Sequence, residues 1–406
     1  MSMAHLTVDP MKFDRIRASI LHGPKDLRVE TRTIRPPNAN EVQIAVRTTG
    51  LCGSDLHYYN HFRNGDIQIL EPLTLGHESA GVVVATGSLV KDVKPGDKVA
   101  LEVGLPCGVC ELCKAGRYNI CPEMKFRSSA KAFPHAQGTL QERINQPAGF
   151  VHKLPAEMSL EMGALLEPLG VAIHAHRRAQ LQPGVKVLVF GAGAVGLLVA
   201  AVLRIQDPQC TVVIADIDAG RIKFALENGF AHCGFPVPLR RANSTEEQLE
   251  IARKIAAEIG EVVVDDNSKL GQVDAVFECT GVPSCLQTSI YATKAGGKIL
   301  LIGMGTPVQT LPISAAALRE VDIIGVFRYA NTYPTGIELL RNAERMREGG
   351  EGVPRFEKMV THRFKGFERI EEAFKMAGKT TDENGKLVLK VVVELDDEDA
   401  HDQSKL

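Results

Sequence analysis

Two patterns of apolar residues divide the chain. Up to about residue 167, short apolar runs lie between turn signals, as at residues 42–46, which alternate, and 81–84, which are continuous. A further run at 94–99 opens after a Pro-Gly turn. Many short strands of this kind predict a partly open antiparallel barrel or sandwich. A helix is expected over residues 159–179, ending before the Pro-Gly pair at 183–184.

From residue 185 the pattern changes to strands that alternate with helices. Continuous apolar strands are predicted at 185–190, 211–216, 273–278 and 297–303, with helical stretches between them. This alternation indicates a doubly wound parallel sheet. The more polar segment 236–269 has no assigned role, although Ser244 reads as the start of a helix. We predict a β-rich domain over 1–170, the parallel sheet over 171–311, a return to the first domain over 312–393, and an acidic flexible tail over 394–406.

Composition describes an ordinary globular protein. The 406 residues are 44% hydrophobic and 24% charged, with a net charge of -2. This balance gives no electrostatic reason to expect a nucleic acid partner, and no apolar run suits a membrane span. The first ten residues lack the features of a secretory signal, so we expect an intracellular protein. Its nine cysteines favour metal ligation over a disulfide framework.

Four of these cysteines are closely spaced. Their spacing is Cys-x2-Cys-x2-Cys-x7-Cys, and they are Cys107, Cys110, Cys113 and Cys121. Four thiolates at such spacing can close a tetrahedron around one zinc and leave no position for chemistry. We expect this site to stabilise a lobe of the first domain. A zinc-binding interaction module is the alternative for this segment taken alone.

A second group of metal-ligand residue types is open. Cys52 precedes the pair His77-Glu78 by one short segment. A thiolate, an imidazole and a carboxylate suit zinc, and three protein ligands leave a fourth position for water or substrate. A buried cysteine with an unrelated histidine is the simpler alternative for this pair alone.

A glycine-rich turn predicts a dinucleotide site. Gly191, Gly193 and Gly196 follow a predicted strand and open a helix, which places helix N–H groups where a pyrophosphate would bind. Asp216 ends the next strand, where a carboxylate can accept hydrogen bonds from ribose hydroxyls and repel a 2′-phosphate. NAD is therefore favoured over NADP, although Arg221 could partly offset Asp216.

Together these motifs resemble the zinc-dependent medium-chain dehydrogenases, in the sorbitol and xylitol (polyol) dehydrogenase branch. The resemblance extends over residues 17–393 and is most specific at residues 76–81, the four cysteines, residues 166–169 and residues 319–329. It implies a GroES-like catalytic domain, a Rossmann domain for NAD, one catalytic and one structural zinc, and a homotetramer or homodimer. The animal polyol enzymes lack the four-cysteine lobe, so the chain is closer to fungal or bacterial members there.

The resemblance also implies roles for individual residues. Cys52, His77 and Glu78 would bind the catalytic zinc, and Glu167 would bind it or hold its water. A simple alcohol dehydrogenase has a cysteine at the position of Glu167. Ser54 would relay a proton, with His57 as a further carrier. The implied substrate contacts are Tyr58, Phe126, Ser129, Arg328 and Tyr329. The further implied cofactor contacts are Val195, Arg221, Ile302, Gly303, Met304 and Phe327.

The activity so implied is oxidation of a secondary hydroxyl of a polyol to a ketose, with hydride transfer to NAD. L-Threonine 3-dehydrogenase and butanediol dehydrogenase use similar zinc ligands and are alternatives. A zinc-less reductase-like or structural protein on the same fold is another. Finally, the sequence ends in Ser404-Lys405-Leu406, which predicts recognition by the peroxisomal import receptor and residence in the peroxisomal matrix, with the cytoplasm as the alternative.

Overall fold

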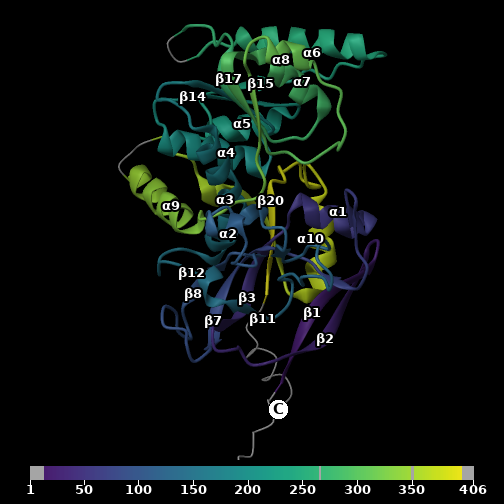
Figure 1. Cartoon of the computed structure of the whole chain (residues 1–406), viewed down its shortest axis with the longest axis vertical. Helices are drawn as coiled ribbons and strands as arrows, with labels where there is room; N and C mark the ends of the chain where they lie inside the picture. Colours follow the sequence, from purple (N-terminus) through teal and green to yellow (C-terminus); the bar gives the residue numbers. More distant parts are fainter. Residues whose placement is uncertain (1–12, 265–266, 349–351, 396–406) are drawn as a thin grey trace, which may run out of the picture.

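The protein has two parts that lie one above the other along the long axis of the molecule, as Figure 1 shows for this computed structural model. The structure describes residues 13–264, 267–348 and 352–395. The lower part is β-rich, and the upper part holds a sheet covered by helices. The expectation of a β-rich domain joined to a doubly wound domain is confirmed.

A seven-stranded sheet forms the frame of the lower part. Its centre is β3, which pairs along its length with β7, β11 and β20. The strands in order are β12 (Val151–Lys153), β8 (Lys98–Leu101), β7 (Glu78–Thr86), β3 (Glu41–Gly50), β20 (Lys390–Glu394) and β19 (Val360–Lys365), with β11 (Arg143–Pro147) beside β3. Apart from the parallel pair β19–β20, these pairings are antiparallel, as predicted.

Smaller sheets surround this frame. A three-stranded sheet has the order β2, β1 and β6, and two short ribbons pair β9 with β10 and β4 with β5. The bounds are β1 (Asp14–Gly23), β2 (Asp26–Ile34), β4 (Arg63–Asn64), β5 (Ile67–Gln68), β6 (Leu73–Thr74), β9 (Gly104–Leu105) and β10 (Lys125–Phe126).

The upper part is a six-stranded parallel sheet. Its strands are β15 (Cys233–Pro236), β14 (Thr211–Asp216), β13 (Lys186–Phe190), β16 (Val273–Glu278), β17 (Thr293–Leu301) and β18 (Asp322–Gly325), in that order. From β13 the chain adds β14 and β15 on one side and then β16, β17 and β18 on the other, which is the strand order of dinucleotide-binding folds. Four of the strands lie where the apolar runs predict them. The short strands β15 and β18 were not predicted.

The position of β18 moves the predicted domain boundary. Because β18 pairs with β17 from Asp322 to Gly325, the chain leaves the parallel sheet after residue 325 and not near residue 312. The return is completed by β19 and β20, which join the lower sheet. The acidic tail and its final tripeptide lie almost wholly outside the described residues, so the peroxisomal assignment stays a prediction.

Ten helices cover these sheets in the described part of the chain. They are α1 (Gly53–His61), α2 (Glu111–Lys114), α3 (Leu160–Ala179), α4 (Ala194–Gln206), α5 (Ala219–Glu227), α6 (Thr245–Gly260), α7 (Pro283–Ala292), α8 (Ile313–Ala317), α9 (Tyr333–Glu348) and α10 (Ile370–Ala377). Two predicted starts are confirmed: Ser159 caps α3 by accepting from Met162 N at 3.2 Å, and Ser244 caps α6 by accepting from Glu247 N at 3.2 Å. None of the described helices is both long enough and apolar enough to cross a membrane.

Apolar cores fill both parts, and one of them spans the boundary, because it holds Ala80 and Ala100 of the lower sheet together with Val187 and Val189 of β13. One core fills the lower barrel, and two others lie on the opposite faces of the parallel sheet. Helix α6 buries Ile255 and Ile259 in one of these, so the polar segment without an assigned role covers one face of the sheet. Helix α3 joins the parts, because it packs against β7 and β8 below and against α4 and α9 above.

Candidate functional site

Two paired strands of the lower sheet bring the predicted zinc ligands together. Cys52 follows the end of β3 and is the N-cap of α1, whereas Glu78 is the first residue of β7 and lies opposite Gly50 of β3. Glycine at position 50 leaves room for Glu78, because a Cβ there would overlap the Glu78 carboxylate and lie 3.3 Å from its Cβ. Pairing of β3 with β7 therefore places Cys52 beside His77-Glu78.

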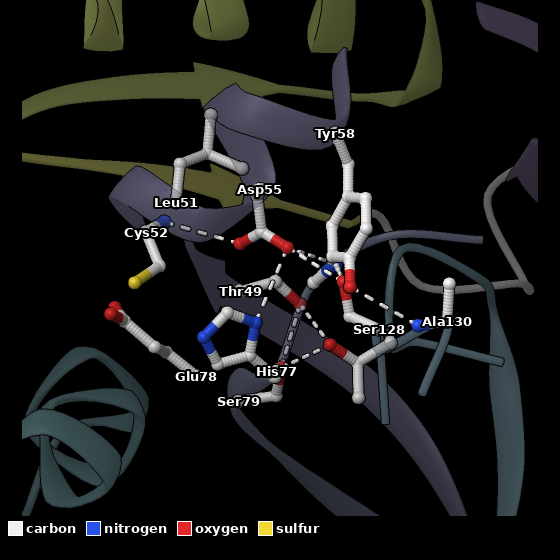
Figure 2. A network of polar contacts seen from close by, with 12 residues as sticks. Thr49, Leu51, Cys52, Asp55, Tyr58, His77, Glu78, Ser79, Ser128 and Ala130 are labelled. Carbon is white, nitrogen blue, oxygen red and sulfur yellow. Dashed lines mark hydrogen bonds and ion pairs between the residues drawn. The ribbon is translucent and has the colours of Figure 1, made fainter. Parts of the chain in front are cut away.

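The ligand atoms of these residues form one compact group. A sulfur of Cys52, a ring nitrogen of His77 and a carboxylate oxygen of Glu78 all lie within 4.8 Å of one another. Figure 2 shows them facing a common space, while the other ring nitrogen of His77 faces Asp55. Ligand atoms around a tetrahedral zinc lie about 3.3–3.8 Å apart, given bonds of about 2.0–2.3 Å. The donor set and its spacing fit zinc after a small adjustment.

Asp55 holds this group in place, and the sequence analysis missed it. Its carboxylate is fully buried and accepts hydrogen bonds from His77 Nδ1 at 3.2 Å, Ser128 Oγ at 2.7 Å, Gly76 N at 3.1 Å and Cys52 N at 3.2 Å. Burial disfavours the charged carboxylate, but the neighbouring His77 and these hydrogen bonds outweigh it and lower the pKa of Asp55. Such a carboxylate fixes the orientation of a metal-binding histidine. The position of Asp55 in the first turn of α1, three residues after Cys52, was the available signal.

Lys390 is a second residue that the sequence analysis missed. Its ammonium donates to both carboxylate oxygens of Glu78, at 2.7 and 2.8 Å, and to the carbonyl of Leu51 at 3.3 Å. Strand β20 makes this possible, because it pairs with β3 on the side opposite β7. Glu78 is therefore shared between the predicted metal position and a buried lysine.

Glu167 lies near these residues but outside their compact group. It is buried in α3 and precedes Pro168. Burial and the neighbouring Glu78 raise the pKa of Glu167 to about 7, although the charge of His77 opposes the shift. The described geometry thus groups three ligands, and direct ligation by Glu167 stays a prediction.

The predicted substrate residues divide into two sets. Phe126, Ser129 and Arg328 line a cavity of about 320 Å³. The ring of Phe126 lies 5.5 Å from that of His77, and the Arg328 guanidinium lies 3.2 Å from the Phe126 centroid. The Phe126 ring therefore lies against both this cavity and the candidate zinc site.

The other predicted residues are not among those that line this cavity. Tyr58 is buried in α1, and its hydroxyl accepts a hydrogen bond from Ala130 N at 3.2 Å. Tyr329 is buried against Tyr333, with 5.7 Å between the rings. Ser54 lies in the first turn of α1 beside Cys52, and His57 is exposed one turn later. Neither tyrosine lines the cavity that Arg328 lines.

The four cysteines of the first motif form a second possible metal site. Residues 107–121, here called the cysteine lobe, place Cys110 Sγ 3.4 Å from Cys113 Sγ and 3.9 Å from Cys121 Sγ, and Cys107 Sγ 3.9 Å from Cys113 Sγ. Thiolates around a tetrahedral zinc lie about 3.8 Å apart. All four are free of disulfides, so the lobe fits one zinc.

The dinucleotide motif lies at the carboxyl edge of the parallel sheet. Gly191 has a φ of +96°, and a Cβ there would lie 2.9 Å from Thr280 Cγ2. Asp216 accepts from Ala192 N at 2.6 Å and from Asp218 N at 2.9 Å, which joins the end of β14 to the glycine turn. A cavity of about 810 Å³ is lined by Gly191, Gly193, Asp216 and Arg221, and by residues of the segment that precedes α6. This cavity suits the adenosine half of a dinucleotide.

The remaining predicted cofactor residues lie on several different elements. Val195 and Gly196 begin α4, and Gly303 N donates to Glu278 O at 2.9 Å next to the glycine turn. Met304 and Phe327 are exposed, whereas Ile302 is partly buried. These five residues and Gly196 do not line the adenosine cavity, and their contact with NAD stays a prediction.

Known proteins resemble the chain over nearly its whole length. Residues 38–156 match the alcohol dehydrogenase GroES-like domain, and residues 194–342 match the zinc-binding dehydrogenase family. Sorbitol dehydrogenase of Bos taurus is 40% identical over 380 residues, which are 94% of this chain and 96% of the relative.

Solved structures extend the comparison to the fold. L-Idonate 5-dehydrogenase from Escherichia coli is 26% identical with a TM-score of 0.78 over 94% of this chain and 99% of its own. 2R,3R-Butanediol dehydrogenase from Bacillus subtilis is 28% identical with a TM-score of 0.74 over 93% and 99%. With the ligand group and the parallel sheet, these similarities show that the chain belongs to the zinc-dependent medium-chain dehydrogenases, in their sorbitol (polyol) dehydrogenase branch.

Proposed function

We propose that this protein oxidises a secondary hydroxyl of a polyol to a ketone and passes the hydride to NAD. The observation that carries the proposal is the compact group of Cys52, His77 and Glu78 beside a cavity lined by Arg328. The identity of 40% to a sorbitol dehydrogenase, over nearly all of both chains, supports a polyol such as sorbitol or xylitol as substrate.

The chain's own residues would prepare the reaction. When bound, zinc would act as a Lewis acid toward the substrate hydroxyl and NAD would accept the hydride. Asp55 holds the His77 ring so that its second nitrogen faces the metal position. Ser54, in the first turn of α1 after Cys52, would accept the hydroxyl proton as it passes its own hydroxyl proton on, and exposed His57 one turn along α1 would carry that proton to solvent.

Arg328 would select substrates with several hydroxyls. Its guanidinium is fixed over Phe126, and its Nη1 is buried with no hydrogen-bond partner among the described residues. A buried donor of this kind is costly unless a ligand completes it. A hydroxyl adjacent to the reacting carbon can supply that acceptor, whereas a simple alcohol cannot.

Two features of the assembled protein follow as proposals. One zinc would bind at Cys52, His77 and Glu78, and a second in the cysteine lobe, so metal analysis should give about two zinc per chain. The protein would also form a homodimer or homotetramer. Strand β18 at the edge of the parallel sheet supports contact with a second copy, as do Val308 and Leu318, which precede it in the sequence and are 84% and 87% exposed.

The alternative enzymes are less well supported. The butanediol dehydrogenase is 28% identical, against 40% for the sorbitol dehydrogenase. A zinc-less protein on this fold would have no reason to bring together a thiol, an imidazole and a carboxylate.

The direct test is NAD reduction over a panel of compounds with the purified, zinc-loaded protein. Sorbitol, xylitol, L-arabinitol and galactitol would represent polyols, and L-threonine, 2,3-butanediol and ethanol the alternatives. The proposal expects turnover of at least one polyol with kcat/KM well above that for ethanol. Turnover of L-threonine or butanediol alone would contradict it.

A further inference from the structure

The segment that carries Arg328 has an unusual backbone. In residues 327–331, here called the substrate segment, Arg328 has a φ of +53° and Asn331 a φ of +56°. A residue other than glycine in this left-handed region costs about 1 kcal/mol or more, so the conformation persists only if surrounding contacts fix it.

The cysteine lobe supplies several of them. Asn119 Nδ2 donates to Phe327 O at 2.8 Å, at the start of the substrate segment. At its end, Asn331 Nδ2 donates to Gly116 O at 3.0 Å and Asn331 N donates to Tyr118 Oη at 2.6 Å. Residues more than two hundred positions apart are thus joined by hydrogen bonds at both ends of the segment.

The same lobe forms a wall of the substrate cavity. Asn119, Ile120 and Cys121 line the cavity of about 320 Å³ together with Phe327 and Arg328. Asn119 is 5% exposed, so its amide makes an internal hydrogen bond and is not a surface group. Loss of the hydrogen bond from Asn119 to Phe327 O would release the backbone next to Arg328 and let its guanidinium leave the Phe126 ring.

We propose that the cysteine lobe is a positioning element for substrate recognition, with Asn119 as its main positioning residue. The lobe holds the substrate segment so that Arg328 faces the substrate, in addition to stabilising its own part of the fold. This inference rests on the proposed polyol oxidation for its kinetic consequences, but the holding of the segment is a property of the protein alone.

The test uses Asn119→Asp and Asn119→Ala in the full, zinc-loaded chain. Aspartate keeps the size of asparagine but cannot donate to Phe327 O, so both variants lose this hydrogen bond. We expect KM for the polyol to rise about tenfold with kcat changed by less than about twofold, since Arg328 would bind substrate and transition state equally less well. Zinc content should match the wild type.

A matched control separates positioning from general destabilisation. Asn228→Ala removes a similar bond, from Asn228 Nδ2 to Phe224 O at 2.9 Å, far from the site in the helix α5 region. It should lower Tm no more than Asn119→Ala does and leave KM unchanged. Asn331→Gly, which keeps the left-handed backbone but removes the bond to Gly116, should raise KM as well.

Hydrogen exchange of the peptide covering residues 327–333 gives a readout that needs no activity. It should be several-fold faster in both Asn119 variants than in the wild type and in Asn228→Ala. Unchanged exchange and unchanged KM in Asn119→Asp would overturn the inference. A wild type that oxidises no polyol would refute the proposed function instead, and the exchange result would still decide whether the lobe holds the segment.

Discussion

The ammonium of Lys390 lies 2.7 and 2.8 Å from the two carboxylate oxygens of Glu78, and the two side chains are 4% and 1% exposed. A buried carboxylate that loses its only nearby ammonium is strongly destabilised, typically by about 3–5 kcal/mol. In Lys390→Met we therefore expect zinc-free protein to lose about 3 kcal/mol of unfolding free energy. Zinc-loaded protein should lose much less, because the metal ion supplies the opposite charge at Glu78.

Urea unfolding with and without zinc measures this difference. Lys98→Met is a suitable control, since the partners of Lys98 Nζ among the described residues are the backbone carbonyls of Ala156 and Met158, at 2.7 and 3.1 Å. The control should lose about 1 kcal/mol whether or not zinc is present. An equal loss in both metal states of Lys390→Met would show that Glu78 does not face the metal.

Asp55 provides a prediction about metal affinity. Asp55→Asn keeps the size of the side chain but removes the charge that orients His77 through a 3.2 Å contact. Loss of such a support typically weakens zinc binding about 10–100-fold. Competition with a chromophoric chelator should show this loss at one zinc per chain, while the zinc of the cysteine lobe stays tightly bound. Weakening of both sites together would point to unfolding of the domain.

Asp216 should determine the choice of dinucleotide. In Asp216→Ser the ribose loses a carboxylate acceptor, and the repulsion toward a 2′-phosphate disappears while Arg221 remains in the same cavity. We expect KM for NAD to rise about tenfold and the ratio of kcat/KM for NADP to that for NAD to increase. Steady-state kinetics with each dinucleotide measure both effects. KM for the polyol at saturating NAD should not change, and an unaltered dinucleotide ratio would remove Asp216 from this role.

His174 gives a prediction about pH. Burial and the nearby Arg178, Arg177 and Arg117 lower its pKa from 6.5 to about 4 in the folded protein. The unfolded chain therefore binds more protons between these values, and the stability contributed by neutral His174 is complete above about pH 7 and lost as the pH falls from about 6.5 to about 4. Because the ring is only half-buried, we expect the unfolding free energy to fall by about 1–2 kcal/mol over this range, which is less than the full pKa shift would give. Unfolding free energy measured from pH 7.5 to 5 should fall less steeply in His174→Gln, and parallel curves would contradict the assignment.

The chemistry of the site was predictable wherever it depends on neighbours in the sequence. Local spacing in the sequence indicates the ligands of three motifs, which are the four cysteines, the pair His77-Glu78 and the glycine turn. The structure brings Cys52 to the pair, as expected. The long strands β13, β14, β16 and β17 were predictable because they are continuous apolar runs. The starts of α3 and α6 followed from Ser159 and Ser244.

Contacts that depend on strand pairing could not be predicted. Lys390 is 312 positions from Glu78, and nothing in its local sequence shows that β20 lies beside β3. The strands β15 and β18 have four residues each, too few to carry a pattern, and β18 shifted the domain boundary. The hydrogen bonds from Asn119 to the substrate segment likewise join two motifs that the sequence presents separately.

The central claim, a zinc-dependent polyol oxidation by NAD at Cys52, His77 and Glu78, is tested most directly by metal removal and return. NADH formation from the preferred polyol should be measured for the purified protein, after removal of the weaker-bound zinc by dialysis against a chelator, and after addition of zinc. We predict that activity is lost with about one zinc per chain, returns with the second zinc, and does not return in Cys52→Ser, although that variant still binds NADH. Full activity at one zinc per chain, or in Cys52→Ser, would contradict the account.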